Sequence, residues 1–242
     1  MKNGVLLCCH GSRSNVGIND TKKLLKTLKK NNKSLLTKIG YLEITKPSIK
    51  DQLEFFFKKN INSLIIVPVM IFSGNHTTKD IPKILRVIKK KYKKSPQVFI
   101  TKPLIFANDF FNTVQRNLKK KIKKNVGLIT VSSNTINPKA KNQIRLLTKK
   151  LSKKNSFMFH KSILINLNKE KLKRELINVC NKNNKLLVLP FFLFRGKLLD
   201  NLIKTIKDLN KKDKSKFILC NHISNNKDIH NLIKNVSNNK LH

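Results

Sequence analysis

Two histidines follow apolar runs that are typical of buried β-strands. His10 begins the run His10-Gly11-Ser12-Arg13 directly after the apolar segment 4–9, and His76 lies just beyond the apolar segment 64–72. In a parallel α/β sheet, both side chains would lie where strands end and helices begin, which is the edge at which such sheets bind ligands. Two imidazoles at that edge indicate metal binding or acid–base chemistry rather than core packing.

An internal repeat separates the fold from this chemistry. A shift of 122 residues aligns residues 34–72 with residues 156–194 without a gap, and the apolar segment 5–9 corresponds to 127–131. The second copy keeps the apolar runs but loses three residues that could bind a metal. At the positions of His10, Glu43 and His76 it carries approximately Ser133, Ile165 and Leu198. We therefore assign the chemistry to the first half.

Alternating apolar runs and amphipathic, lysine-rich stretches predict a βα repeat with parallel sheets. We expect two tandem, similar halves, residues 1–122 and 123–242, each a small parallel sheet flanked by helices, with the first catalytic and the second degenerate. Strands are predicted near 4–9, 35–42, 63–70, 96–100, 126–131, 157–165, 185–191 and 215–220. Helices are predicted near 17–31, 47–59, 78–92, 106–121, 138–153, 168–182, 197–210 and 225–236.

Three segments of the first half together carry a family resemblance. They are the strand followed by His10 to Arg13, the segment Tyr41-Leu42-Glu43-Ile44-Thr45-Lys46-Pro47-Ser48, and the segment Val67-Pro68-Val69-Met70-Ile71-Phe72-Ser73-Gly74-Asn75-His76. The chain resembles the sirohydrochlorin chelatases of the CbiX/SirB family in their long, two-half form. The resemblance implies a class II, ATP-independent enzyme that inserts cobalt or ferrous iron into sirohydrochlorin, in cobalamin or siroheme biosynthesis. It implies no cofactor beyond the substrate metal, Co²⁺ or Fe²⁺.

The resemblance also assigns roles to particular residues. His10 is expected to be a metal ligand and general base, His76 a second ligand and proton relay, and Glu43 a third ligand or a contact to a pyrrole nitrogen. The expected substrate-binding residues are Ser12, Arg13, Glu43, Ile71, Phe72, Ser73, Gly74 and Asn75. Structural roles remain open: a histidine bonded to a loop carbonyl, an exposed loop histidine, a glutamate paired with lysine, or an arginine in a salt bridge between helices. The carboxylates Asp20, Asp51, Asp80 and Asp200 are interpreted as helix-face or helix-start charges.

The formal net charge of +41 normally indicates a nucleic acid or an anionic membrane as partner. Here the excess is lysine spread over many helix faces, with only six arginines, the residue best suited to phosphate and base contacts. We interpret the charge as solvated surface under the bias of an A/T-rich genome, and expect no nucleic-acid partner. A nucleic-acid-binding protein, suggested by charge alone, and a metal carrier without insertion activity are the alternatives. A degenerate, inactive remnant is disfavoured by the intact trio.

The remaining features bound the setting of the protein. No apolar run approaches the roughly 18–20 residues of a membrane span, so we expect no membrane association and a cytoplasmic enzyme, or a stromal one if it is organelle-encoded. The cysteines Cys8, Cys9, Cys180 and Cys220 lack metal or disulfide spacing and are expected to be buried thiols. We expect His160, His222, His230 and His242 to have surface or packing roles. A monomer is expected, with a dimer as the alternative.

Overall fold

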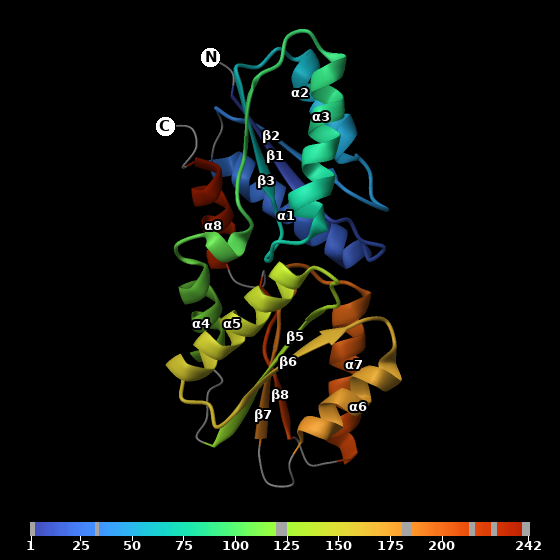
Figure 1. Ribbon diagram of the computed structural model, residues 1–242, viewed down its shortest axis with the longest axis vertical. Helices are drawn as coiled ribbons and strands as arrows, with labels where there is room; N and C mark the ends of the chain where they lie inside the picture. The colour runs from blue at the N-terminus through green and yellow to red at the C-terminus, as the bar shows by residue number, and fades with distance from the viewer. Residues whose placement is uncertain are drawn as a thin grey trace. The chain divides into compact units, whose positions relative to one another are not determined.

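The structure, a computed structural model, describes residues 3–31, 34–119, 125–180, 185–212, 216–223 and 227–238. The chain forms two compact units, Met1–Phe110 with Lys227–His242 and Phe111–Asn226. Each unit contains one four-stranded sheet whose strands are all parallel (Figure 1). The predicted fold class, two similar βα-repeat halves with a small parallel sheet each, is confirmed.

The first unit has the strand order β2-β1-β3-β4. Its strands are β1 (Asn3–Cys9), β2 (Leu36–Tyr41), β3 (Ser63–Pro68) and β4 (Gln97–Ile100). Its helices are α1 (Asn15–Asn31), α2 (Ile49–Lys58), α3 (Ile81–Lys91) and α8 (Lys227–Asn238), with a π-helical turn η1 (His76–Asp80) and a 3-10 turn η2 (Leu104–Phe106).

Helices cover both faces of this sheet, which explains why its central strands are continuously apolar. On one face, Leu6 and Ile66 pack with Phe56 of α2 and Ile81 of α3 in one buried cluster. The alternate side chains of β1 and β3 point to the other face, where α8 packs beside α1 and against β3. A capping box between Ser48 and the N3 residue of α2 fixes the start of that helix.

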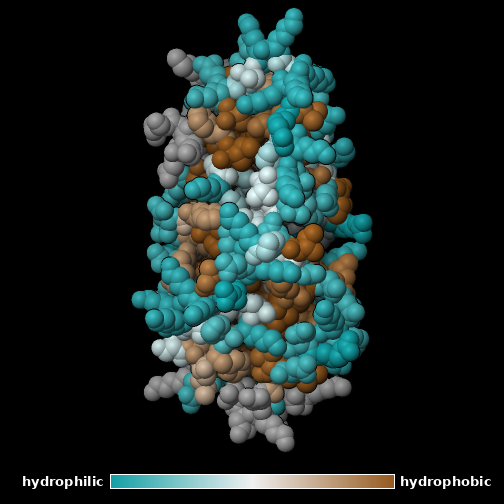
Figure 2. All heavy atoms as spheres, in the orientation of Figure 1, coloured by the Kyte–Doolittle hydropathy of each residue, from teal (hydrophilic) through white to brown (hydrophobic). Residues whose placement is uncertain are grey.

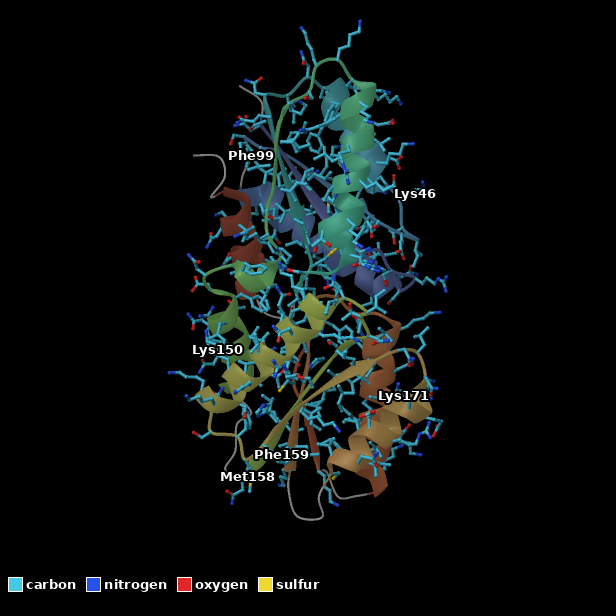
Figure 3. The ribbon with its side chains drawn as sticks, viewed as in Figure 1. Lys46, Phe99, Lys150, Met158, Phe159 and Lys171 are labelled. Carbon is cyan, nitrogen blue, oxygen red and sulfur yellow. The ribbon has the colours of Figure 1, made fainter. Side chains whose placement is uncertain are left out.

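The second unit repeats the topology, with the strand order β6-β5-β7-β8. Its strands are β5 (Val126–Ser133), β6 (His160–Ile165), β7 (Lys185–Pro190) and β8 (Phe217–Leu219). Its helices are α4 (Phe110–Lys119), α5 (Pro138–Lys154), α6 (Lys169–Val179) and α7 (Lys197–Lys212). Gly127 of β5 is required by packing, because a Cβ there would meet the ring of Phe159, which lies at the amino-terminal end of β6 (Figure 3).

The compact units do not coincide with the two sequence halves. Helix α4 follows β4 in the chain, yet all but its first residue belongs to the second unit, where the Lys150 ammonium lies 4.4 Å from the ring centroid of Phe111 and Asn117 donates to the Asn221 carbonyl. Helix α8 follows β8 but belongs to the first unit (Figure 1). The two units have thus exchanged their last helices. The predicted boundary between residues 122 and 123 lies outside the described residues.

Within the described residues, no helix combines the length and the apolar character needed to cross a membrane. Figure 2 shows hydrophilic residues spread over the whole viewed face, with smaller apolar areas between them. Lysines occur in most of the helices and are not gathered on one element.

Candidate metal centre

The loop that carries His10 requires a glycine. Gly11 has a φ of +105°, a conformation that side chains disfavour, and a Cβ on it would collide with the Glu43 carbonyl oxygen. The chain therefore turns immediately after His10 and lies directly against the end of β2. The imidazole of His10 is left exposed at the carboxyl end of the sheet.

Backbone hydrogen bonds hold the Glu43 loop against the His10 loop. The ladder between β1 and β2 continues past the strands, because Leu42 N–H donates to the Cys9 carbonyl at 2.9 Å and Glu43 N–H donates to the His10 carbonyl at 3.0 Å. One turn further on, the Thr45 hydroxyl accepts from Ser12 N–H and donates to the Ser12 carbonyl, both at 3.0 Å. The relative position of His10 and Glu43 is thus set by main-chain contacts.

Ile44, directly after Glu43, has a φ of +65° and is 60% exposed. A β-branched residue disfavours the left-handed region, and such outliers gather at functional sites. The loop continues through Lys46, which lies at the outer edge of the first unit (Figure 3). The Lys46 ammonium is 3.9 Å from the Asp51 carboxylate, and both side chains are well exposed, so this ion pair contributes little to stability.

His76 begins the π-helical turn η1, just beyond the end of β3. The Gly74 carbonyl anchors this turn, because it accepts hydrogen bonds from the hydroxyls of Thr77 and Thr78 at 2.9 and 3.0 Å. The His76 carbonyl in turn accepts from Ile81 N–H, which closes the wide turn. Single π-helical turns recur at functional sites, and this one presents the second imidazole.

His10, Glu43 and His76 come together as the sequence predicts. Each offers one ligand atom, and the three atoms lie within 4.8 Å of one another. The two imidazole rings meet edge to face, with centroids 4.8 Å apart and an interplanar angle of 80°. Among the residues that the structure describes, this is the only group of three or more histidine, cysteine or acidic side chains arranged to hold a metal ion.

Two imidazoles and one carboxylate suit Co²⁺ or Fe²⁺ and leave coordination positions open. His10 and Glu43 are exposed and His76 is half-buried, so a metal bound here stays accessible to a second molecule. The neighbouring thiols do not join the set. Burial raises the pKa of Cys8 and of Cys9, and the thiolate, which is the metal-binding form, is therefore disfavoured. The prediction of buried thiols is confirmed for Cys8, Cys9 and Cys220 and is wrong for Cys180, which is half-buried.

Sequence analysis missed one residue of this site, Asp80. Its carboxylate Oδ2 lies 2.7 Å from His76 Nδ1. Asp80 lies at the start of α3, as predicted, but its carboxylate makes no capping hydrogen bond to that helix and contacts a candidate ligand instead. A histidine followed four residues later by a carboxylate, at the start of a helix, is the signal that could have found it.

The expected substrate-binding residues differ in exposure. Ile71 and Ser73 are buried, so their side chains face the protein interior. Phe72, Gly74 and Asn75 are half-buried, and a Cβ on Gly74 would meet no atom within 4 Å. Space is therefore open beside the Gly74 backbone.

The two residues after Gly11 also differ from each other. Ser12 is half-buried, and its hydroxyl accepts from Ser14 N–H at 3.0 Å. Arg13 is exposed and forms no ion pair with any carboxylate among the described residues. The salt bridge between helices, left open as its alternative, is therefore not formed within the described part of the chain.

The second unit has no such trio at the equivalent place. Strand registers pair Cys8 with Pro68 and Gly40 in the first unit, and Val131 with Pro190 and Ile163 in the second. This register places Ser133 at the position of His10, as expected. It moves the equivalent of Glu43 by one residue, from Ile165 to Asn166.

None of the other histidines in the described part of the chain belongs to a group of side chains that could hold a metal ion. His160 is exposed at the start of β6, and His222 is half-buried. His230 of α8 is also half-buried, and its burial lowers its pKa. His242 lies outside the described residues.

Known proteins share both the sequence pattern and the fold. The sequence model of the CbiX family matches residues 4–121 and again residues 127–239. A sirohydrochlorin ferrochelatase of Priestia megaterium is 25% identical over 225 residues, covering 90% of this chain and 83% of that protein. A sirohydrochlorin cobaltochelatase of Saccharolobus islandicus is 28% identical over 131 residues, covering 50% of this chain and 98% of that protein.

Solved structures agree with these relatives. The sirohydrochlorin chelatase SirB from Bacillus subtilis subspecies spizizenii, in complex with cobalt, superposes with a TM-score of 0.79 at 19% identity, covering 99% of this chain and 94% of that one. SirB from Bacillus subtilis with Fe³⁺ gives a TM-score of 0.80 at 18% identity. The two-unit fold is therefore shared over nearly the whole chain.

Proposed function

This chain belongs to the CbiX family, and we propose that it is a sirohydrochlorin chelatase that inserts cobalt or ferrous iron into sirohydrochlorin without ATP. The observation that carries the proposal is the convergence of His10, Glu43 and His76 within 4.8 Å at the carboxyl end of the first sheet. The family relatives name the substrate, since one is a ferrochelatase and another a cobaltochelatase of sirohydrochlorin.

The ligand set fits a metal that has to leave again. Neutral imidazole and carboxylate bind Co²⁺ and Fe²⁺, but three such ligands hold the ion less firmly than a closed thiolate site would. The exposed positions of His10 and Glu43 allow the macrocycle to approach the bound ion from solvent. As the ion moves onto the pyrrole nitrogens, the bonds to the protein ligands break and both inner protons of the macrocycle are released.

His10 is the residue we assign to accept a proton from the macrocycle. It is the more exposed of the two imidazoles, and an imidazole released by the departing metal has a lone pair available as a base near neutral pH. Glu43 is held beside it by the bond from its N–H to the His10 carbonyl, and offers a second acceptor.

Two further roles complete the proposal. The open space at Gly74 and the half-buried Phe72 and Asn75 are proposed to line the macrocycle. The lysine-rich surface is proposed to speed capture of this polycarboxylate substrate by long-range attraction. Lacking the trio, the second half is proposed to act as a scaffold, and the enzyme is proposed to act in the cytoplasm, or in the stroma if it is organelle-encoded.

An anaerobic insertion assay tests the proposal. Purified protein is mixed with sirohydrochlorin and Co²⁺ or Fe²⁺, and the visible spectrum is followed for wild type, His10→Ala, His76→Ala and the control His160→Ala. His160 is an exposed histidine outside the trio. We expect insertion well above the uncatalysed rate, a loss of at least about 10²-fold in both trio variants, and no loss in the control.

Other outcomes separate the alternatives. Co²⁺ binding that depends on the trio without any accelerated insertion would identify a metal carrier instead. Tight, salt-dependent DNA binding that survives both trio substitutions, again without insertion, would favour the nucleic-acid alternative. Either result overturns the chelatase proposal.

A further inference from the structure

Asp80 holds the ring of His76 in place. The Asp80 carboxylate Oδ2 lies 2.7 Å from His76 Nδ1, a short distance for a hydrogen bond between an imidazole and a carboxylate. We propose that Asp80 is a positioning residue for the metal site: it accepts the Nδ1 proton of His76 and thereby directs the Nε2 lone pair toward His10 and Glu43. The metal role of His76 rests on the function proposed above.

The contact is not explained by helix capping. Asp80 precedes α3 and has helical backbone angles, but its side chain makes no capping hydrogen bond to that helix. His76 and Asp80 are the first and last residues of the π-helical turn η1, so the turn itself brings the two side chains together. The carboxylate is therefore engaged by the imidazole and not by the backbone of the helix it precedes.

A contact like that between Asp80 and His76 has a known role in metal sites. A histidine that binds a metal through one ring nitrogen commonly donates its other N–H to a carboxylate, which fixes the tautomer, restrains the ring and makes the ligand more basic. With Nδ1 engaged, only Nε2 of His76 is available to an ion. A surface ion pair alone would be worth little, because the side chains of His76 and Asp80 are 33% and 45% exposed.

The side chains of His10 and His76 then differ in how firmly they are held. His10 is exposed, and within the described residues its ring contacts the ring of His76 but has no carboxylate or carbonyl partner. His76 is half-buried and held by Asp80. This asymmetry assigns His76 to the fixed ligand that captures the ion, and His10 to the movable ligand that releases it and takes a proton.

The second copy of the repeat lost both members of the pair. The shift of 122 residues places Leu198 at His76 and Leu202 at Asp80, and Leu202 is completely buried. Where the histidine is absent, the carboxylate is absent too, and an apolar side chain packs into the core instead. This joint replacement agrees with a role for the Asp80 carboxylate in holding the His76 ring.

The test compares Asp80→Asn with Asp80→Ala, and uses Asp109→Ala as the control. Asn keeps an acceptor for Nδ1–H, Ala removes it, and Asp109 is an exposed carboxylate of the same unit. Two readouts need no sirohydrochlorin: the tautomer of His76 from ¹⁵N chemical shifts at pH 8, and the affinity for Co²⁺ from titration calorimetry. A protein that fails the insertion assay would still report on this proposal.

We expect wild-type His76 to carry its proton on Nδ1. Asp80→Ala is expected to give mixed tautomers and to weaken Co²⁺ binding by about 10–100-fold, while Asp80→Asn retains the Nδ1–H tautomer and binds within about 3-fold of the wild type. Asp109→Ala should match the wild type in both readouts. Unchanged tautomer and affinity in Asp80→Ala would overturn the proposal. So would equal losses of affinity in both Asp80 variants with the tautomer unchanged, because the effect would then be one of charge alone.

Discussion

Two glycines close in sequence to the proposed metal ligands provide a matched pair of substitutions, Gly11→Ala and Gly74→Ala. Both lie in loops at the carboxyl ends of strands, but only Gly11 is required by the backbone. Gly11 has a φ of +105° and its added Cβ would collide with the Glu43 carbonyl oxygen. An added Cβ on Gly74 meets nothing within 4 Å. We expect Gly11→Ala to damage both the fold and the metal site, and Gly74→Ala to damage neither.

The expected magnitudes follow from these contacts. An alanine at the φ of Gly11 costs about 1–3 kcal/mol in backbone strain. Displacing the Glu43 carbonyl also weakens the hydrogen bonds that Glu43 makes with His10 and Thr45, each worth about 0.5–1.5 kcal/mol. We therefore expect Gly11→Ala to lower the free energy of unfolding by about 2–4 kcal/mol. Gly74→Ala should leave it unchanged or raise it by up to about 1 kcal/mol, because alanine restricts the unfolded chain.

Urea unfolding followed by tyrosine emission measures this difference in the first unit alone. The chain has no tryptophan and two tyrosines, Tyr41 and Tyr92, and both belong to that unit. With a urea dependence of about 1–3 kcal/mol per molar, a loss of 3 kcal/mol lowers the midpoint by about 1–3 M. Co²⁺ affinity should fall in Gly11→Ala and persist in Gly74→Ala. Equal midpoints for the two variants would refute the claim that the Glu43 carbonyl needs a glycine beside it.

Two further predictions concern titrating groups that are not members of the trio. Burial raises the pKa of Cys8 and Cys9, and the charge of Cys9 raises the pKa of Cys8 further. A thiol reagent at pH 8 should therefore modify the half-buried Cys180 of the native protein first. Equally rapid consumption of the reagent by a Cys180→Ser variant would contradict this prediction. Burial lowers the pKa of His230 below its ordinary value of about 6.5, so the unfolded state binds more protons. The free energy of unfolding of the first unit should then decline as the pH falls below about 6.5. Urea unfolding at pH 7 and pH 5 measures this decline, which should be smaller in the His230→Gln variant than in the wild type.

The central strands could be predicted from the sequence because they are covered on both faces. The buried run Leu64–Val67 has no polar interruption, and the prediction of a strand near 63–70 agrees with β3 (Ser63–Pro68). The predicted helix at 78–92 is correct for α3, which begins at Ile81, but the π-helical turn before it was not foreseen. A π-helical turn has no apolar period of its own, so a hydrophobic pattern carries no signal for it.

The sequence also could not predict which unit each helix packs into. An amphipathic stripe shows that a helix packs against something apolar, but the stripes of α4 and α8 fit either sheet, because the two sheets repeat each other. The convergence of His10, Glu43 and His76, by contrast, could be predicted because chain topology alone brings the ends of β1, β2 and β3 to one edge. Asp80 could not be found from that rule, since its contact depends on the local turn rather than on the sheet.

The second copy shows that the ligand set depends on the backbone as much as on its side chains. The register that equates His10 with Ser133 equates Gly11 with Asn134, which does not have a positive φ. The hydrogen bonds between the two loops differ as well: Glu43 N–H donates to the His10 carbonyl in the first unit, whereas Asn134 N–H donates to the Ile165 carbonyl in the second. Placing two histidines and a glutamate at the equivalent positions would leave that loop on a different path. We therefore expect the proposed metal site to need the glycine turn in addition to its three side chains.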